Sequence, residues 1–163
     1  MIHAPHNSLA THTLHLADEA ATARLGQMLA RHLPLLKTVF LHGHLGAGKT
    51  CLVRALLREL GHTGPVKSPT YTLMEPYVVS TISVYHFDFY RFTSPEEFLE
   101  AGLDEYFEMG GSCWVEWSEK AQPYLPLPDL EIFLDITGCS RNARLTGLSE
   151  TGKKCIEMLK ETI

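Results

Sequence analysis

The sequence contains no long apolar run, and its cysteines are few and scattered. No segment approaches the ~20 apolar residues that a membrane-spanning helix requires, and Met1 to His6 lack the basic and apolar regions of a signal peptide. The 4 cysteines form no Cys-x-x-Cys pair, which argues against zinc or disulfide frameworks and favours reduced, partly buried thiols. We therefore expect a cytoplasmic protein that does not act at a membrane.

Basic clusters are also scarce. The formal net charge is −5, and the basic side chains are scattered along the chain. Proteins that bind nucleic acid on their own usually carry a basic stripe, so we expect that any RNA involved is held by another protein. Histidines crowd the N-terminus without a clear metal-ligand pattern, and we expect a solvated segment there. These histidines are His3, His6, His12 and His15.

The composition is that of an ordinary globular domain. Of 163 residues, 45% are hydrophobic and 20% are charged, which suits one domain with a sizeable core. No repeat, low-complexity tract or linker divides the chain. We expect a single domain over residues 1–163.

The strongest functional pattern lies at residues 43–50. Gly-His-Leu-Gly-Ala-Gly-Lys-Thr fits the phosphate-binding loop, or P-loop, Gly-x-x-x-x-Gly-Lys-Ser/Thr. Glycines allow the backbone to turn its N–H groups toward phosphates. Lys49 can reach the β- and γ-phosphates, and the Thr50 hydroxyl can join a Mg²⁺ shell. A β-rich run at 38–41 and a helical pattern at 51–60 flank the loop, which is the context that the motif requires.

The other elements follow from periodicity and from turn residues. Further strands are predicted at 11–16, 78–90, 112–117 and 130–136, and further helices at 18–32, 94–107 (with Ser94 as N-cap) and 149–159. Residues 61–77 are predicted to form a long irregular connection. Connections of this length are often functional.

Two carboxylates stand where predicted strands end. Asp88 and Glu116 are candidates to hold Mg²⁺ or orient a water, as carboxylates beside a phosphate loop commonly do. For Asp88 the alternative is a surface ion pair with Arg91, and Trp117 could pack in the core or shield the site. The hydroxyls of 68–72 could sense a γ-phosphate, as in P-loop switches, or belong to an ordinary surface loop.

Four blocks of the sequence, in this order, resemble the TsaE (formerly YjeE) family, which are small bacterial P-loop ATPases required to make threonylcarbamoyladenosine in tRNA. The blocks are 43–50, 66–73, 86–91 and 116–117; residues 18–22 and Arg141 also fit. The resemblance implies an α/β, P-loop NTPase-like three-layer fold with a mainly parallel central sheet and flanking helices. Two departures are small: His44 replaces a frequent Asp, and Cys51 replaces a common Thr.

The resemblance also implies roles for individual residues. Catalytic roles fall to Asp88, Lys49 and Glu116, and Mg²⁺ ligation to Thr50 and Glu116. The switch-like loop comprises Ser68, Pro69 and Thr70. The residues expected to bind ATP or ADP are Leu45, Gly46, Ala47, Gly48, Lys49, Thr50, Arg141 and, as a weaker candidate, Glu19.

The implied function is that of a slow Mg²⁺-dependent ATPase that works with the TsaD and TsaB proteins. It would couple ATP turnover to cycling of the TsaD/TsaB complex and would meet tRNA only through that complex.

Three other interpretations stay open. A GTPase is suggested by Asp-x-x-Gly at 135–138, although no Asn-Lys-x-Asp run exists for guanine. A small-molecule kinase would need an arginine-bearing lid, and only Arg91, Arg141 and Arg144 lie beyond the P-loop helix. A nucleotide-gated interaction module, whose output is binding and for which hydrolysis is a reset, overlaps with the family picture.

Overall fold

The computed structural model describes residues 9–162. His3, His6 and the stretch considered as a signal peptide lie outside these residues. Across residues 9–162, no helix is both long and apolar enough to cross a bilayer.

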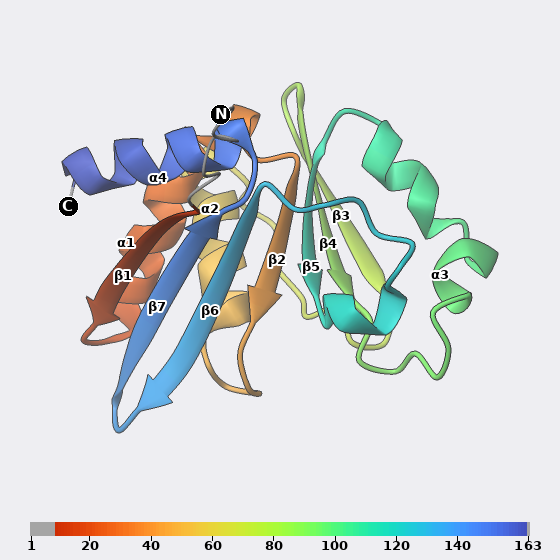
Figure 1. Ribbon diagram of the computed structural model, residues 1–163, viewed down its shortest axis with the longest axis horizontal. Helices are drawn as coiled ribbons and strands as arrows, with labels where there is room; N and C mark the ends of the chain where they lie inside the picture. Colours follow the sequence, from red (N-terminus) through yellow and green to blue (C-terminus); the bar gives the residue numbers. More distant parts are fainter. Residues whose placement is uncertain (1–8, 163) are drawn as a thin grey trace, which may run out of the picture.

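In the described part of the chain, seven strands form one sheet in the order β1-β7-β6-β2-β5-β4-β3 (Figure 1). Neighbours in the centre are parallel (β6·β2, β2·β5 and β5·β4), while the pairs β1·β7, β7·β6 and β4·β3 are antiparallel. The prediction of a mainly parallel central sheet is confirmed, with antiparallel strands added at both sides. The strands are β1 (Ala10–Leu16), β2 (Thr38–His42), β3 (Met74–Val79), β4 (Ile82–Asp88), β5 (Ser112–Glu116), β6 (Leu130–Thr137) and β7 (Ser140–Gly147).

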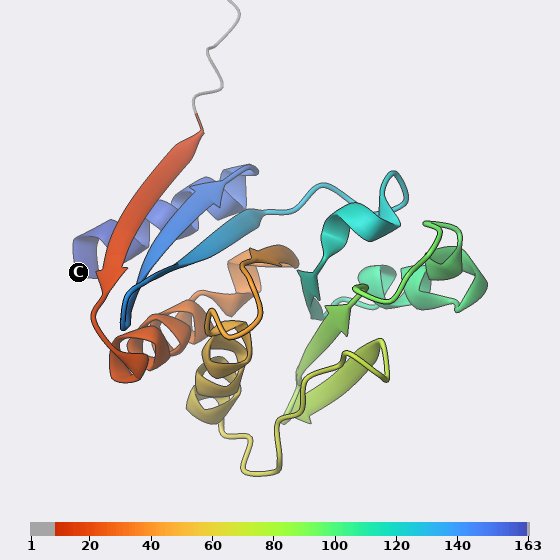
Figure 2. The same ribbon diagram turned by 90° about the horizontal axis from the view of Figure 1, so that it is seen from below.

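Helices cover both faces of the sheet and complete the three layers. α1 and α2 contribute to one buried cluster together with α4, and an aromatic-rich cluster packs on the other face of β4 and β5. Figure 2 shows β4 and β5 between α2 on one side and the α3 region on the other. The helices are α1 (Glu19–Arg31), α2 (Lys49–Leu60), α3 (Glu97–Glu100) and α4 (Glu150–Thr162), with 3-10 turns η1 (Leu33–Leu35), η2 (Leu103–Glu108) and η3 (Ser118–Ala121).

α1 packs closely against α2, the helix that follows the P-loop. The contact is at Gly26, where an added Cβ would lie 2.6 Å from the Leu52 carbonyl oxygen and 2.9 Å from the Ala55 Cβ. Only glycine fits this crossing without displacing backbone. Asp18 caps α1 by accepting a hydrogen bond from the Ala21 amide at 2.8 Å, so the start of α1 is well defined.

Two predicted elements are wrong in extent. Residues 78–90 are not one strand, because β3 and β4 form a hairpin around Ser80 and Thr81, and the irregular connection therefore ends at Leu73 rather than Tyr77. Ser80 adopts a φ of 58°, which is a left-handed conformation. A Gly or Asn at this position would have indicated the turn in the sequence, whereas a serine does not.

The helix predicted at 94–107 is divided. α3 has 4 residues with Glu96 rather than Ser94 at its N-cap, and η2 follows after Gly102, whose φ is 69°. The left-handed glycine ends the first segment, although the apolar spacing continues across it.

One carboxylate joins three elements at the start of the central sheet. Asp129 Oδ2 accepts hydrogen bonds from the amides of Lys37 (2.8 Å) and Thr38 (3.0 Å). Its Oδ1 accepts one from Ser149 Oγ at 2.7 Å, just before α4. Asp129, which precedes β6, therefore links the beginning of β6 to the beginnings of β2 and α4 by hydrogen bonds.

We predict that Asp129→Ala lowers the free energy of unfolding by about 3 kcal/mol, because several hydrogen bonds to one charged group are lost and two amides are left without an acceptor. Urea denaturation measures the change. Asp135→Ala is the matched control, since Asp135 is exposed near the other end of β6, and it should change stability by less than about 0.5 kcal/mol. Equal unfolding midpoints for the two variants would contradict this role.

Candidate functional site

The carboxyl ends of the parallel strands β2, β4 and β5 meet at one edge of the sheet. β2 leads directly into the P-loop, and its neighbour β5 ends at Glu116, which lies in register with Leu41 of β2 and Asp88 of β4. Such an edge is where open α/β sheets place ligands. The register therefore brings both predicted carboxylates beside the P-loop.

The P-loop has the backbone that an anion cradle needs. Gly46 and Gly48 have φ values of 84° and 107°, and a Cβ added to Gly46 would meet no atom within 4 Å. α2 begins immediately afterwards at Lys49 and runs for 12 residues, so its N-terminal amides point toward the same space. This open, glycine-lined turn at a helix N-terminus fits a phosphate chain.

Arg141 supports the P-loop from β7. Its Nε donates a hydrogen bond to the Ala47 carbonyl at 3.1 Å, and its Nη2 donates one to the Gly46 carbonyl at 3.0 Å. These two carbonyls are therefore satisfied by a residue of another strand. The resemblance implies that Arg141 lies close to the nucleotide; in the structure its guanidinium is hydrogen-bonded to two carbonyls of the loop.

Lys49 and Glu116 form a buried ion pair. Lys49 Nζ donates to the Gly43 carbonyl at 2.6 Å and lies 3.2 Å from Glu116 Oε1, and the two residues are only 8% and 4% exposed. Burial by itself would raise the pKa of Glu116, but the hydrogen bond and attraction of His86, followed by those of Lys49, hold the pKa below its ordinary value. Glu116 is thus a carboxylate at neutral pH and can attract a cation.

Asp88 is connected to the loop that was predicted to be switch-like. Its Oδ2 accepts from Thr70 Oγ1 at 3.0 Å, its Oδ1 accepts from the Tyr90 amide at 2.9 Å, and Thr70 Oγ1 lies 2.8 Å from Ser68 Oγ. Asp88 is buried, and Arg91 lies over the Tyr71 ring at 4.0 Å. The alternative of a surface Asp paired with Arg91 is therefore wrong.

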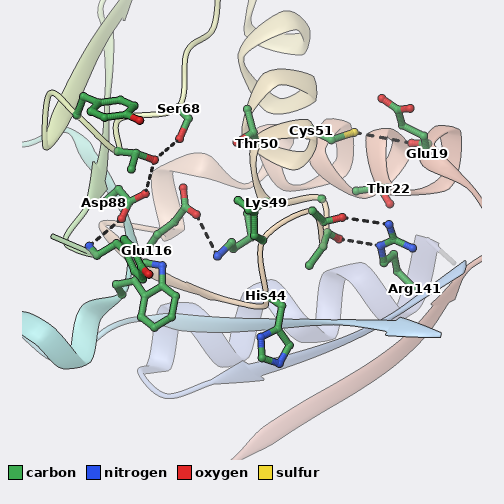
Figure 3. Close-up of a pocket in the computed structure, with 18 of the residues that line it drawn as sticks. Glu19, Thr22, His44, Lys49, Thr50, Cys51, Ser68, Asp88, Glu116 and Arg141 are labelled. Carbon is green, nitrogen blue, oxygen red and sulfur yellow. Dashed lines mark hydrogen bonds and ion pairs between the residues drawn. The ribbon is translucent and has the colours of Figure 1, made fainter. Parts of the chain in front are cut away.

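These residues surround one cavity of about 1010 Å³ (Figure 3). In this view Glu19 and Arg141 lie at one end, Asp88 and Glu116 at the other, and Lys49 between them. Pro69 is buried. The predicted residues that line the cavity are Glu19, Leu45, Gly46, Ala47, Gly48, Lys49, Thr50, Ser68, Thr70, Asp88, Glu116 and Arg141.

Sequence reasoning overlooked part of the cavity wall. Asp18, Tyr71 and Tyr90 also line it, and Trp117, whose role was left open, stands in the wall with its ring 5.0 Å from that of Tyr90. A φ of 58° at Trp117 turns the chain sharply after β5. A left-handed conformation at a residue other than glycine is uncommon, and the sequence did not indicate this turn.

The donor set suits Mg²⁺ bound together with a phosphorylated ligand. Mg²⁺ usually takes one or two protein carboxylates and completes its octahedron with phosphate oxygens and waters. The Thr50 hydroxyl and the Glu116 carboxylate line the same cavity as the anion cradle, and all their donor atoms are oxygen. These residues fit the metal that was predicted.

We predict that Arg141→Lys loosens the P-loop, because an ammonium cannot donate to two carbonyls in the fork geometry of a guanidinium. Hydrogen exchange of the Ala47 amide, which donates to the His44 carbonyl at 3.0 Å, should accelerate about tenfold, corresponding to the loss of one charged hydrogen bond. Arg144→Lys is the matched control, since Arg144 lies over the Phe133 ring at 4.2 Å. Unchanged exchange in Arg141→Lys would show that the loop keeps its shape without the guanidinium.

Comparison with known proteins supports the resemblance. A family model described as "Threonylcarbamoyl adenosine biosynthesis protein TsaE" matches residues 16–144. A Haemophilus influenzae protein named tRNA threonylcarbamoyladenosine biosynthesis protein TsaE is 42% identical over 149 residues, covering 88% of this chain and 94% of that protein. A protein of the same name from Nostoc sp. is 40% identical over 123 residues, covering 73% and 75% respectively.

A solved structure agrees with the sequence comparisons. The crystal structure of YdiB from Bacillus subtilis superposes with a TM-score of 0.80 at 25% identity, over 96% of this chain and 98% of that one. All residues that line the cavity fall within the span 16–144 matched by the family model.

Proposed function

The chain belongs to the TsaE family, and from this membership and the cavity we propose that it is the ATP-binding and ATP-hydrolysing component of the TsaB–TsaD–TsaE system, which forms threonylcarbamoyladenosine in tRNA. The observation that carries the proposal is the convergence of Lys49, Glu116 and Asp88 on one P-loop cavity. Relatives across most of the chain are named tRNA threonylcarbamoyladenosine biosynthesis proteins.

The P-loop residues would bind the phosphates of ATP. The amides of 45–50 would donate to phosphate oxygens, and Lys49 would turn from Glu116 to the β- and γ-phosphates. Thr50 and Glu116 would hold Mg²⁺, which neutralises phosphate charge when bound. Glu19 and Arg141, at the other end of the cavity, would lie beside the rest of the nucleotide.

Asp88 is the group best placed to act on water. It is buried at the carboxyl end of β4, next to Glu116 in the register, and P-loop hydrolases use a residue near the γ-phosphate to orient the attacking water. The Thr70 hydroxyl already donates to Asp88 at 3.0 Å, so a movement of either the loop or Asp88 would break this contact.

This hydrogen bond suggests how turnover is coupled to the partner proteins. Binding of ATP and Mg²⁺ would order residues 68–72 through Thr70 and Ser68, and the ordered face would meet the TsaD/TsaB complex. Turnover is then slow in the isolated protein and faster in the complex, and the hydrolysis step resets the loop. tRNA is reached only through that complex.

Contacts of three arginines weigh against the kinase alternative. A kinase lid needs arginines that are free to close over the donor, but Arg91 lies over Tyr71, Arg141 donates to P-loop carbonyls, and Arg144 lies over Phe133. The GTPase alternative is weakened too, because residues 135–138 are exposed at the end of β6 and the following turn.

The decisive assay is ATP hydrolysis by the purified protein alone and with TsaD and TsaB. We predict low activity alone and a rise of at least about tenfold in the ternary mixture, because a partner that completes a P-loop site accelerates hydrolysis. Lys49→Ala should abolish the rise, while Lys154→Ala, an exposed change on α4, should keep it. No response to the partners, together with a phosphorylated acceptor among the products, would favour a kinase instead.

A second assay tests the metal ligand. Glu116→Gln should raise the Mg²⁺ concentration needed for half-maximal hydrolysis by about tenfold or more, because the amide has no charge for the cation. Nucleotide affinity in EDTA should change far less, and the exposed Glu119→Gln serves as control. Equal Mg²⁺ dependence in Glu116→Gln and wild type would remove Glu116 from the metal site.

A further inference from the structure

A fully buried imidazole on β4 has no role in the mechanism described above. His86 has an exposed fraction of 0%, and its Nε2 lies 2.7 Å from Glu116 Oε2. Its Nδ1 is buried and has no hydrogen-bond partner within residues 9–162. Burying a polar atom without a partner is destabilising, so an aliphatic side chain would fill this position at lower cost. The hydrogen bond to Glu116 is the interaction that a histidine makes here and an aliphatic side chain could not make.

The strand register explains how His86 reaches Glu116. Side chains alternate along a strand, so His86 projects from the same face of β4 as Asp88. In the parallel pair β4·β5, His86 is in register with Trp114, and Asp88 is in register with Glu116. His86 therefore lies two residues further from the carboxyl ends of the strands than Glu116 does. It approaches the Glu116 carboxylate from the buried side. Lys49, which lines the cavity, approaches from the open side.

The two oxygens of Glu116 consequently have different partners. Oε2 is bonded to His86 Nε2 at 2.7 Å, and Oε1 lies 3.2 Å from Lys49 Nζ. An ionised carboxylate only accepts hydrogen bonds, so Nε2 of His86 must carry the hydrogen. If Lys49 turns to a phosphate, as the proposed function requires, His86 is the contact that remains on the carboxylate.

We propose that His86 is a positioning residue for the metal site: by holding Oε2, it fixes the Glu116 carboxylate so that Oε1 faces the cavity and can bind Mg²⁺ when Lys49 moves to the nucleotide. This inference rests on the proposed function. Partners behind a metal ligand commonly set its orientation, and their loss weakens metal affinity by 10–100-fold. Without His86, the buried carboxylate would lose its orientation and part of its compensation for burial at the moment when Lys49 leaves.

The test measures nucleotide affinity by calorimetry, with ADP as the probe, in EDTA and across a Mg²⁺ titration. His86→Leu removes the donor, and we expect the half-saturating Mg²⁺ concentration to rise about 10–100-fold while affinity in EDTA changes less than about threefold. His86→Gln carries an amide N–H near the position of Nε2 and should restore most of the Mg²⁺ response. Phe87→Leu is the matched control, because Phe87 is fully buried on the opposite face of β4; it should lower the melting temperature without moving the Mg²⁺ midpoint.

A second measurement keeps the proposal testable if His86→Leu does not fold. In wild-type protein labelled with ¹⁵N-histidine, the His86 signals are assigned by their loss in His86→Gln. We expect a hydrogen on Nε2 that is protected from exchange, and a shift of this resonance when Mg²⁺ is added to the ADP complex. A neutral ring with its hydrogen on Nδ1 would overturn the proposal, since such a ring cannot donate to Glu116.

The outcomes separate this inference from the function on which it rests. Wild-type protein that showed no Mg²⁺-dependent ADP binding would overturn the proposed function and the role of His86 together. Normal wild-type binding with an unchanged Mg²⁺ midpoint in His86→Leu would overturn the positioning role alone. Equal losses of affinity in EDTA and in Mg²⁺ would also overturn it, because they would indicate a purely structural defect.

Discussion

A lysine ammonium buried in a protein needs acceptors, and the site depends on the two that Lys49 finds. The Gly43 carbonyl at 2.6 Å belongs to the P-loop, and Glu116 Oε1 at 3.2 Å belongs to β5. This arrangement requires β2 and β5 to be parallel neighbours in the observed register, with Leu41 opposite Glu116. A shift of one residue would turn Glu116 toward the aromatic cluster on the other face and would leave the ammonium without its counter-charge.

The remainder of the sheet supports this contact from both sides. On one side, Arg141 of β7 donates to two P-loop carbonyls, so the antiparallel part of the sheet contacts the loop backbone directly. On the other side, β4 contributes Asp88 to the cavity and His86 to the Glu116 carboxylate. Gly26 lets α1 approach α2 closely enough for Glu19 to reach the same cavity. The sheet topology thus explains why residues far apart in the chain serve one site.

The charges in the cavity suggest how a ligand changes it. In the structure, Lys49 and Glu116 form an ion pair, and Thr70 is hydrogen-bonded to Asp88. A phosphate chain would compete for Lys49, and a cation would compete for Glu116. A phosphate that takes Lys49 leaves Glu116 without its counter-charge, and a cation that takes Glu116 does the same to Lys49, so phosphate and metal should favour each other's binding. A ligand that contacts Asp88 would also compete with its hydrogen bond from Thr70. It would thereby affect the loop that we propose faces the partner proteins.

Local patterns alone predicted the P-loop, its flanking strand and helix, and the placement of Asp88 and Glu116 at strand ends, because glycine dihedrals and side-chain periodicity are properties of short segments. The hairpin turn at Ser80 and the break at Gly102 were not predicted, since a left-handed backbone interrupts an apparently continuous apolar spacing at both places. The contact between His86 and Glu116 joins residues 30 positions apart and depends on which strands are neighbours and in what register. That pairing is decided only when the whole sheet assembles, so no pattern within either strand reveals it.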